Sequence, residues 1–449
     1  MAVYDFDLFC LGAGSGGVRI TRRAGAAGKR VAVAEESRIG GTCVNRGCIP
    51  KKFYVFASHF AEDFEDAAGY GWQVGDASFD WPTLVAAKEK ELARLGGIYD
   101  RMLADAGVSY VEGRGTLIDA HTVEVAGKRM SAEVIVINTG ARPQFPDIPG
   151  IEHAISSDEV FDLDDFPNRL AIIGGGYIAV EFAGIFNGLG ADVSLFYRRD
   201  KILRGFDEDV RTTLQEEMIK KGVDVVLETT FEAIEKTAGG LRVTTSAGEV
   251  RDFDQVLMAT GRNPNTQGIG LEAAGVTLDG NGAIVVDEFS QTTADNIYAI
   301  GDVTDRLALT PIAIHEAQCL FETLYRGKPT KPNHHDVASA VFSQPTVSCV
   351  GYTEADARDE FGAVDIYRSG FKPLKHTVSG RDERAMMKLV VDGASNRVVG
   401  AHMVGPEAGE IIQGIAIAVK AGLTKEAFDA TIGIHPTTAE EFVLMREKS

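Results

Sequence analysis

Residues 6–17 decide the fold, with Phe6-Asp-Leu-Phe-Cys-Leu11 running directly into Gly12-Ala-Gly-Ser-Gly-Gly17. The apolar run predicts a buried strand, and the Gly-x-Gly-x-x-Gly spacing predicts a tight turn into a helix. The helical pattern continues to about Gly28, and Val31-Ala-Val-Ala34 predicts a second strand. We therefore expect a strand–helix–strand unit whose glycines let backbone approach a pyrophosphate at a helix N-terminus.

The same pattern returns in the middle of the chain. Leu170-Ala-Ile-Ile173 predicts a strand, Gly174-Gly-Gly-Tyr-Ile-Ala179 the turn, and Asp192 to Tyr197 the next strand. Two such units indicate two bound nucleotides and electron transfer between them. The expected fold class is α/β, with two Rossmann-like dinucleotide-binding domains.

The residue that ends the second strand differs between the two units. Glu35 lies near the position where a carboxylate would hold ribose hydroxyls. The second unit has Tyr197 there, followed by Arg198, Arg199 and Arg204. Guanidinium groups suit a 2′-phosphate and cannot replace a hydroxyl acceptor, so the second unit favours NADPH over NADH.

Gly301-Asp302 follows a later strand signal, Tyr298-Ala-Ile300, and precedes a helical pattern from Pro311 to Tyr325. Such a second flavin-type element favours FAD over NAD in the first unit. A strand–helix turn without a nucleotide is the alternative, and the strand–helix–strand setting argues against it.

The five cysteines are odd in number, which argues against a disulfide scaffold. Cys10, Cys319 and Cys349 lie in apolar runs and are expected to be buried structural residues. Cys43 and Cys48 differ because they lie together among glycines, within Gly40-Gly-Thr-Cys43-Val-Asn-Arg-Gly-Cys48-Ile-Pro-Lys51-Lys52. No second Cys/His cluster accompanies them, so we expect no metal site.

The spacing of Cys43 and Cys48 constrains the local backbone. On a regular helix, Cα atoms five residues apart are roughly 8–9 Å apart, and a disulfide requires less than about 7 Å. An oxidised pair therefore needs a distorted helix opening, which Gly47 and Pro50 favour. A helix N-terminus there, and the nearby cations, would lower the thiol pKa values.

His435-Pro-Thr-Thr-Ala-Glu440 near the C-terminus pairs an imidazole with a carboxylate. Such a partner fixes the tautomer and suits an acid/base catalyst. Alone, His435 would be an ordinary surface histidine, but a redox dithiol in the same chain favours catalysis. His334-His335-Asp336 lies in a linker and is expected to be a solvated loop.

Bulk properties exclude several classes of protein. The net charge of −20 argues against nucleic-acid and anionic-membrane partners. No apolar run reaches membrane-spanning length, and the first residues resemble no signal peptide, so we expect a cytoplasmic protein.

Taken together, these motifs resemble the pyridine-nucleotide disulfide oxidoreductases of class I over the whole chain, and within them most closely the glutathione reductases. The resemblance implies an FAD-binding domain (1–141), an NADPH-binding domain (142–263), a central segment completing the FAD domain (264–334) and an α+β dimer-interface domain (335–449). It implies NADPH-dependent reduction of glutathione disulfide by a homodimer whose active site is shared between subunits.

The resemblance also implies roles for single residues. Cys43 would be the interchange thiol and Cys48 the thiolate against the flavin. Lys51 would lie by flavin N5, paired with Glu181. His435, held by Glu440, would serve the other subunit.

The cofactor contacts come from the motifs and the resemblance. Tyr177 would be a lid over the nicotinamide pocket, Asp302 would hold the ribityl chain, and Arg262 would be a further NADPH contact. The full expected set is Gly12, Gly14, Ser15, Gly16, Gly17, Glu35, Gly41, Thr42, Thr139, Gly140, Gly174, Gly176, Tyr177, Ile178, Ala179, Arg198, Arg204, Gly261, Arg262, Gly301, Asp302 and Thr310.

Expected substrate contacts are Arg19, Arg22 and Tyr99. The chain departs from some glutathione reductases, with Gln318 at a substrate-binding arginine position and Met102 at an asparagine position. We therefore expect Arg19 to compensate for Gln318, or else only to cover apolar surface with its stem.

Two alternative activities stay open, reduction of another low-molecular-weight disulfide and dihydrolipoamide dehydrogenase activity. Dihydrolipoamide dehydrogenases normally carry Ser where Lys52 stands and an acidic residue at the ribose position, and neither feature is present here. Trypanothione reductases have an acidic residue and a tryptophan at the positions of Arg19 and Arg22, and the opposite charge here suits an anionic disulfide.

Overall fold

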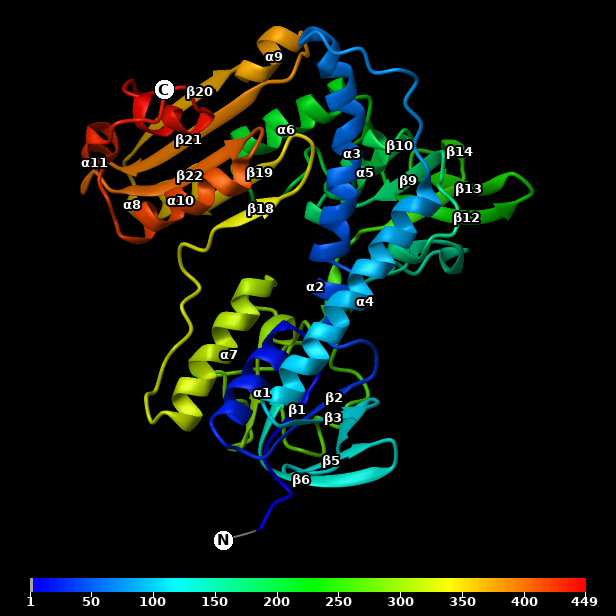
Figure 1. The fold of residues 1–449 in the computed structure, drawn as a ribbon, viewed down its shortest axis with the longest axis vertical. Helices are drawn as coiled ribbons and strands as arrows, with labels where there is room; N and C mark the ends of the chain where they lie inside the picture. The colour runs from blue at the N-terminus through cyan, green and yellow to red at the C-terminus, as the bar shows by residue number, and fades with distance from the viewer. Residues whose placement is uncertain (1–2) are drawn as a thin grey trace. The chain divides into compact units, whose positions relative to one another are not determined.

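The computed structural model describes residues 3–449, and its contacts group the chain into two compact units (Figure 1). The first unit holds the residues up to Lys51, Pro82–Gln144 and Gly261–His334. The second holds Lys52–Trp81, Phe145–Thr260 and His335–Ser449.

The first unit is built on a sheet with the strand order β3-β2-β1-β6-β5-β4, in which β17 also pairs with β6. Strands β1, β2, β3, β6 and β17 run parallel, and β4 and β5 are antiparallel additions. The bounds are β1 Phe6–Leu11, β2 Val31–Glu35, β3 Val108–Glu112, β4 Gly115–Leu117, β5 Thr122–Val125, β6 Lys128–Ile137 and β17 Ile297–Ala299, with a separate pair β7 Ala141–Pro143 and β16 Arg262–Pro264.

Successive side chains of β1 point to opposite faces of this sheet, as strand geometry requires. Leu8 and Cys10 belong to one apolar core, which also contains residues of the helices α1 (Ser15–Ala26) and α7 (Thr310–Tyr325). Phe9 and Leu11 belong to the core on the other face. The glycine turn after β1 is therefore held between a rigid sheet and the start of a packed helix.

Two further long helices are α3 (Cys48–Gly69) and α4 (Trp81–Asp105), and a short helix α2 (Gly41–Asn45) precedes α3. The first four residues of α3 belong to the first unit and the rest to the second. Gly301–Thr304 forms a single 3₁₀ turn, η3. It is followed within a few residues by α7.

The second unit contains a parallel sheet of order β11-β10-β9-β15-β8 and an antiparallel three-stranded sheet β12-β13-β14. Their bounds are β8 Ile155–Ser156, β9 Arg169–Ile173, β10 Asp192–Phe196, β11 Asp224–Val226, β12 Phe231–Thr237, β13 Gly240–Thr245, β14 Val250–Phe253 and β15 Gln255–Met258. Helices α5 (Tyr177–Gly188) and α6 (Glu208–Lys220) follow β9 and β10, and the 3₁₀ turns η1 (Ile151–His153) and η2 (Glu159–Asp162) precede them.

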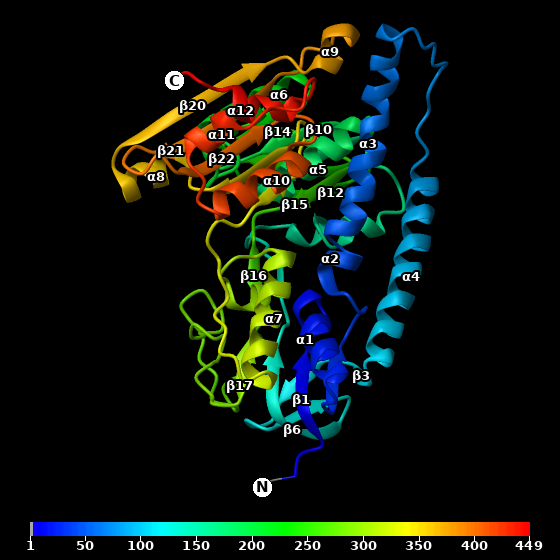
Figure 2. The same ribbon diagram turned by 60° about the vertical axis from the view of Figure 1, so that its left-hand side comes forward.

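The C-terminal part of the second unit is an antiparallel sheet of order β18-β19-β22-β21-β20, with α10 packed beside β19 and β22 (Figure 2). The bounds are β18 Ser339–Val341, β19 Val347–Gly351, β20 Val364–Phe371, β21 Ala385–Asp392, β22 Val398–Val404, α8 Glu354–Phe361, α9 Leu374–Ser379, α10 Ala408–Lys420, α11 Lys425–Ala430, η4 Thr438–Glu440 and α12 Glu441–Leu444.

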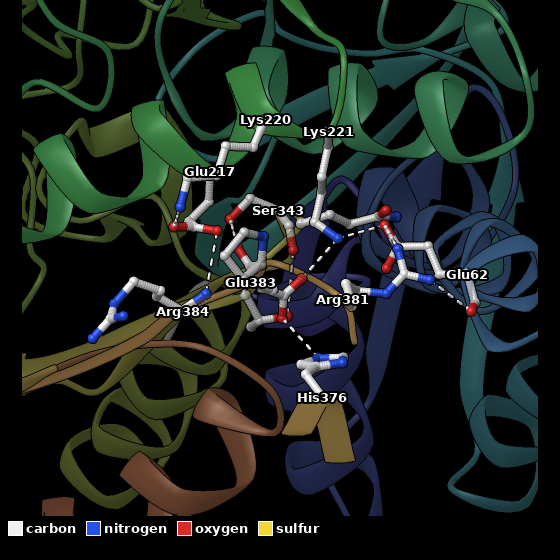
Figure 3. A network of polar contacts seen from close by, with 12 residues as sticks. Glu62, Glu217, Lys220, Lys221, Ser343, His376, Arg381, Glu383 and Arg384 are labelled. Carbon is white, nitrogen blue, oxygen red and sulfur yellow. Dashed lines mark hydrogen bonds and ion pairs between the residues drawn. The ribbon is translucent and has the colours of Figure 1, made fainter. Parts of the chain in front are cut away.

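A buried network of charges joins α3 and α6 to the β20–β21 connection within the second unit (Figure 3). Lys221 Nζ lies 2.7 Å from Glu383 Oε2 and also binds Glu62 of α3. Arg381 Nε donates to Asp66 Oδ1 at 3.0 Å. Because buried charges are tolerated only when paired, this network fixes α3 in one position against its neighbours.

The α/β fold class expected from the sequence is confirmed, and both predicted strand–turn–helix–strand units are present. The bounds of the four predicted segments stay a prediction. Within residues 3–449, no helix combines the length and apolar character that a membrane span needs.

Candidate active site

The first glycine turn is closed so tightly that side chains are excluded. Gly12 has φ +98°, and a Cβ there would lie 2.4 Å from the carbonyl oxygen of Asn138. A Cβ on Gly17 would lie 2.0 Å from the carbonyl oxygen of Gly12. Gly41 lies against the same turn, since its Cβ would be 2.7 Å from the Cα of Gly14. These residues fit a pyrophosphate, because bare backbone faces the N-terminus of α1.

Glu35, the last residue of β2, is bonded back to this turn. Its Oε2 accepts the N–H of Ala13 at 2.9 Å, and its Oε1 accepts the N–H of Ser37 at 2.9 Å. The carboxylate is thereby held at the edge of the turn, where the remaining lone pairs suit ribose hydroxyls.

The second glycine turn is equally crowded at its first glycine but has free space at its third. Gly174 has φ +143°, and a Cβ there would lie 2.2 Å from the carbonyl oxygen of Ala259. A Cβ on Gly175 would lie 2.5 Å from the ring of Tyr197, whereas one on Gly176 would meet nothing within 4 Å. Tyr177 begins α5 and is 44 % exposed. Ile178 and Ala179 complete the first helical turn, and their backbone can face a nucleotide.

The basic residues after β10 are exposed. Arg198, Arg199 and Arg204 form no ion pair with any residue between 3 and 449. Lys201, by contrast, binds Glu208 and donates to Thr212 Oγ1 at 2.9 Å. Uncommitted guanidinium groups beside a glycine turn are available for a 2′-phosphate.

Cys43 and Cys48 are brought together by a break between two helices. Helix α2 ends at Asn45, Arg46 leaves helical geometry with φ −141°, and Cys48 begins α3. A Cβ on Gly47 would lie 2.8 Å from the carbonyl oxygen of Thr42, so glycine permits this bend. The expected distortion of the helix opening is confirmed, and the two side chains are hydrogen-bonded thiols.

The electrostatics of the two thiols are unequal. The hydrogen bond to Cys48, burial and the charge of Cys48 together raise the pKa of Cys43. The expectation of a lowered thiol pKa is therefore wrong for Cys43, because the hydrogen bond to Cys48 and burial both favour the protonated form. Cys48 lies at the first position of a long helix, where the dipole favours negative charge. Its Sγ is 3.7 Å from Thr310 Oγ1, at the start of α7.

Asp302 lies in the η3 turn, next to the N-terminal end of α7 in the chain. Burial raises the pKa of this carboxyl, the charge of Glu316 adds to the effect and Arg262 opposes it. Arg262 Nη2 donates to the carbonyl oxygen of Ala141 at 2.5 Å, and Thr139 Oγ1 donates to that of Asn265 at 2.8 Å. Gly140 and Gly261 border the paired strands β7 and β16, which hold this corner closed.

The expected substrate residues Arg19 and Arg22 lie on α1, and Tyr99 lies on α4. Burial raises the pKa of Tyr99, with a further contribution from Cys43 and an opposing one from Arg22. Arg22 Nη1 lies 2.9 Å from Met102 Sδ. Arg19 has a buried Nε without a hydrogen-bond partner, and burial lowers the pKa of its guanidinium, with Arg22 and Arg23 adding to the effect. Tyr99 is thus the expected substrate residue whose pKa responds to both Cys43 and Arg22.

His435 and Glu440 meet in the second unit. The imidazole Nδ1 lies 3.1 and 3.2 Å from the two carboxylate oxygens, and the His435 side chain is 82 % exposed. Glu181 accepts the N–H of Phe342 at 2.8 Å, and Lys51 lies in the first turn of α3. The pairing of Lys51 with Glu181 stays a prediction.

Sequence reasoning missed Glu316 and misplaced His334. His334 is half-buried and its Nε2 lies 2.8 Å from Glu316 Oε1, so the solvated-loop interpretation is wrong for this residue. The available signal was a carboxylate within the apolar stripe of α7 that includes Ile312, Ala313 and Leu320.

The remaining cysteines are structural, as expected for two of them. Cys10 and Cys319 are buried, and burial raises the pKa of each. Cys349 is half-buried, with its Sγ 3.4 Å from Ser339 Oγ.

Two nucleotide-binding turns and a dithiol at a broken helix opening define the class of protein, an oxidoreductase that exchanges electrons between nucleotides and thiols. The chain matches the family "Pyridine nucleotide-disulphide oxidoreductase" over residues 6–317 and the dimerisation domain of that family over 337–446. It belongs to this family.

Curated relatives extend over the whole chain. It is 52 % identical over 448 residues to a glutathione reductase of Burkholderia cepacia, with 100 % of both chains covered. It is 50 % identical to a glutathione reductase of Nostoc sp., covering 99 % of this chain and 100 % of that one. A trypanothione reductase of Trypanosoma congolense is 41 % identical, with 99 % and 96 % covered.

The predicted resemblance to the glutathione reductases is therefore confirmed. The chain is a disulfide reductase that uses FAD and NADPH.

Proposed function

We propose that the chain reduces glutathione disulfide to two molecules of glutathione with NADPH, through FAD and the Cys43/Cys48 pair. The observation that carries the proposal is the hydrogen-bonded dithiol at the start of α3, with Thr310 of α7 beside Cys48. The first glycine turn suits FAD, and the second, with its uncommitted arginines, suits NADPH.

When bound, FAD would supply two-electron transfer from NADPH to the Cys43–Cys48 disulfide, so that Cys43 and Cys48 are present as the dithiol. Cys43 then attacks one sulfur of glutathione disulfide, which forms a mixed disulfide and releases the first glutathione thiolate. Because its pKa is raised, Cys43 needs a base, and His435 of the partner subunit accepts its proton and returns it to the departing thiolate. Cys48 next attacks Cys43, which releases the second glutathione and closes the disulfide.

Within that proposal, most side chains bind and orient. FAD is held by the glycines of the first turn together with Glu35, Thr42, Thr139, Asp302 and Thr310. Arg198, Arg204 and Arg262 hold NADPH, and Tyr177 covers the nicotinamide pocket. Glu440 orients His435, and Glu181 orients Lys51 toward the flavin.

Substrate binding is assigned to a local positive group. Glutathione disulfide carries several carboxylates, and the chain has a net charge of −20, so attraction must be local. Arg19 and Arg22 lie three residues apart on α1, which puts them on one face. Gln318 is uncharged and its Nε2 donates to Glu322 Oε1 at 2.7 Å, so this side chain does not supply the positive charge of an arginine. Arg19, Arg22 and Tyr99 therefore take the anionic substrate.

The dimerisation domain implies a homodimer, and we propose that its two active sites are shared, each with His435 from the partner subunit. The exposed imidazole supports this arrangement, because among residues 3–449 it is bound through Nδ1 to Glu440 and its Nε2 is left to face a substrate. The acidic net charge disfavours nucleic-acid and anionic-membrane partners. A cytoplasmic location stays part of the proposal.

Steady-state kinetics with NADPH and a panel of disulfides tests the proposal. Glutathione disulfide should be turned over fastest, against trypanothione disulfide, lipoamide and cystine. Cys43→Ser should keep flavin reduction by NADPH and lose disulfide turnover, whereas Cys48→Ser should lose the long-wavelength thiolate–flavin band. Cys349→Ser is the matched control and should keep full activity. Normal turnover by both Cys43→Ser and Cys48→Ser would sink the dithiol relay.

The Cys43→Ser variant also tests the shared site. Mixed under subunit exchange with an inactive His435→Ala variant, it should restore about a quarter of the activity, because half of the dimers would carry one intact site. Absence of any recovery in exchanged dimers would place His435 and Cys43 of one active site in the same chain.

A further inference from the structure

Glu316 is a buried carboxylate that the proposed mechanism does not use. It lies on α7 with 1 % of its surface exposed. Its Oε2 accepts the backbone N–H of Gly301 at 2.7 Å. Gly301 begins the η3 turn and directly precedes Asp302. The carboxylate therefore holds the backbone one residue before the proposed ribityl-binding side chain.

The second oxygen of Glu316 is bound by an arginine and a histidine. Arg306 Nη2 and His334 Nε2 each lie 2.8 Å from Oε1. A buried carboxylate without such partners would strongly destabilise the fold. Both oxygens are thus committed, and the carboxylate is held in one orientation.

Arg306 extends the clamp to the rest of the turn. Its Nε donates to Thr304 Oγ1 at 3.2 Å, and this hydroxyl donates to the carbonyl oxygen of Gly301 at 2.8 Å. Gly301 is bonded at its N–H by Glu316 and at its carbonyl by Thr304. A Cβ on Gly301 would lie 3.2 Å from Asn138 Oδ1 and 3.3 Å from the Cβ of Ala313, so the turn has little room to shift.

We propose that Glu316 is a positioning residue that sets Asp302 for the flavin by holding the N–H of Gly301, with Arg306 and His334 fixing the Glu316 carboxylate. The inference rests on the proposed function, because it takes Asp302 as a flavin contact. It extends that function by placing flavin affinity partly under the control of a side chain on α7 and a histidine of the linker.

The test measures FAD release on dilution of the holoenzyme, followed by recovery of flavin fluorescence. Glu316→Ala should weaken FAD binding about tenfold to a hundredfold, because it removes a charge-assisted hydrogen bond. Glu316→Gln keeps an acceptor for Gly301 and should restore the affinity to within a few-fold. Glu322→Ala, on the same helix, is the control and should bind FAD as the unmodified protein does.

A second reporter separates positioning from general loss of structure. At saturating FAD, the visible circular dichroism of the bound flavin should change in Glu316→Ala and stay unchanged in Glu322→Ala. If Glu316→Ala fails to fold, the half-exposed His334→Ala variant takes its place, with a several-fold loss of FAD affinity expected.

Two results would overturn the inference, namely unchanged FAD affinity in both Glu316→Ala and His334→Ala, or a Gln variant that is no better than the Ala variant. Unmodified protein that binds no FAD would instead overturn the proposed function, so the two failures are distinguishable.

Discussion

The two glycine turns have similar backbone conformations, but different side chains lie beside them. Gly12 and Gly174 both have positive φ. A Cβ on Gly12 would collide with the carbonyl oxygen of Asn138, and one on Gly174 with that of Ala259. Glu35 then bonds back to the first turn, whereas the Tyr197 ring covers Gly175 in the second. Glycine spacing therefore specifies the turn, and the residue that ends the second strand specifies the charge of the ligand.

The helices after the turns differ as well. Helix α1 carries Arg19, Arg22 and Arg23, and none of these side chains is fully buried. Helix α5 is buried over most of its length, including its one charged residue, Glu181. Helix α1 thus has a partly exposed basic face that can bind an anionic substrate, whereas α5 is packed into the core.

The largest effect is expected from removing the positive charge at the second turn. Replacing Arg198 and Arg204 together with Gln should raise the Michaelis constant for NADPH by a factor of about 10² to 10⁴, since each charge-assisted contact contributes about 1.5–3 kcal/mol. The Michaelis constant for NADH should change little. Lys201→Gln is the control, because Lys201 is already committed to Glu208. Equal use of NADPH and NADH by the unmodified protein would contradict the assignment.

A smaller effect is expected on the first helix. Arg19→Glu should raise the Michaelis constant for glutathione disulfide by about tenfold or more at low salt, through reversal of a local charge, and the loss should shrink as salt rises. The Michaelis constant for NADPH should stay the same. Arg23→Glu, one turn further on, is the matched control, since its guanidinium lies over the Phe321 ring at 4.7 Å. If the Michaelis constant for glutathione disulfide is unchanged in Arg19→Glu, then Arg19 only covers apolar surface.

The smallest effect is expected at Glu35. Glu35→Gln keeps one carbonyl acceptor but loses the charge, which should weaken FAD binding by only a few-fold, about 1 kcal/mol. The measurement is the FAD dissociation constant from fluorescence titration. A loss as large as that of Glu316→Ala would mean that the Glu35 carboxylate does more than bind ribose hydroxyls.

The sequence predicted the elements around both turns almost to the residue, because apolar strands and glycine spacing are local signals. The strand Phe6–Leu11 and the helix ending at Tyr325 were expected and are present. The broken helix between Cys43 and Cys48 followed from disulfide geometry alone. These features depend on neighbours in the chain.

The rest depends on neighbours in space. No sequence spacing connects Glu316 with Gly301, which lies 15 residues away and on a different element. His334 does lie in a loop, but the solvated environment expected for it is wrong, because its partner Glu316 lies on α7. The raised pKa of Cys43 likewise requires the thiol–thiol hydrogen bond, which only the folded break supplies.

The length of α7 between Thr310 and Glu316 has a further consequence. Thr310 reaches Cys48, and Glu316 reaches Gly301, so one stretch of helix spans about 9 Å between the dithiol and the flavin turn. Inserting or deleting a single residue between them would rotate one end by about 100° relative to the other. A substitution at Thr310 or Glu316 removes one of the two contacts, whereas a change in the length of the segment between them would disrupt both at once. We therefore expect substitutions in this segment to be tolerated better than insertions or deletions.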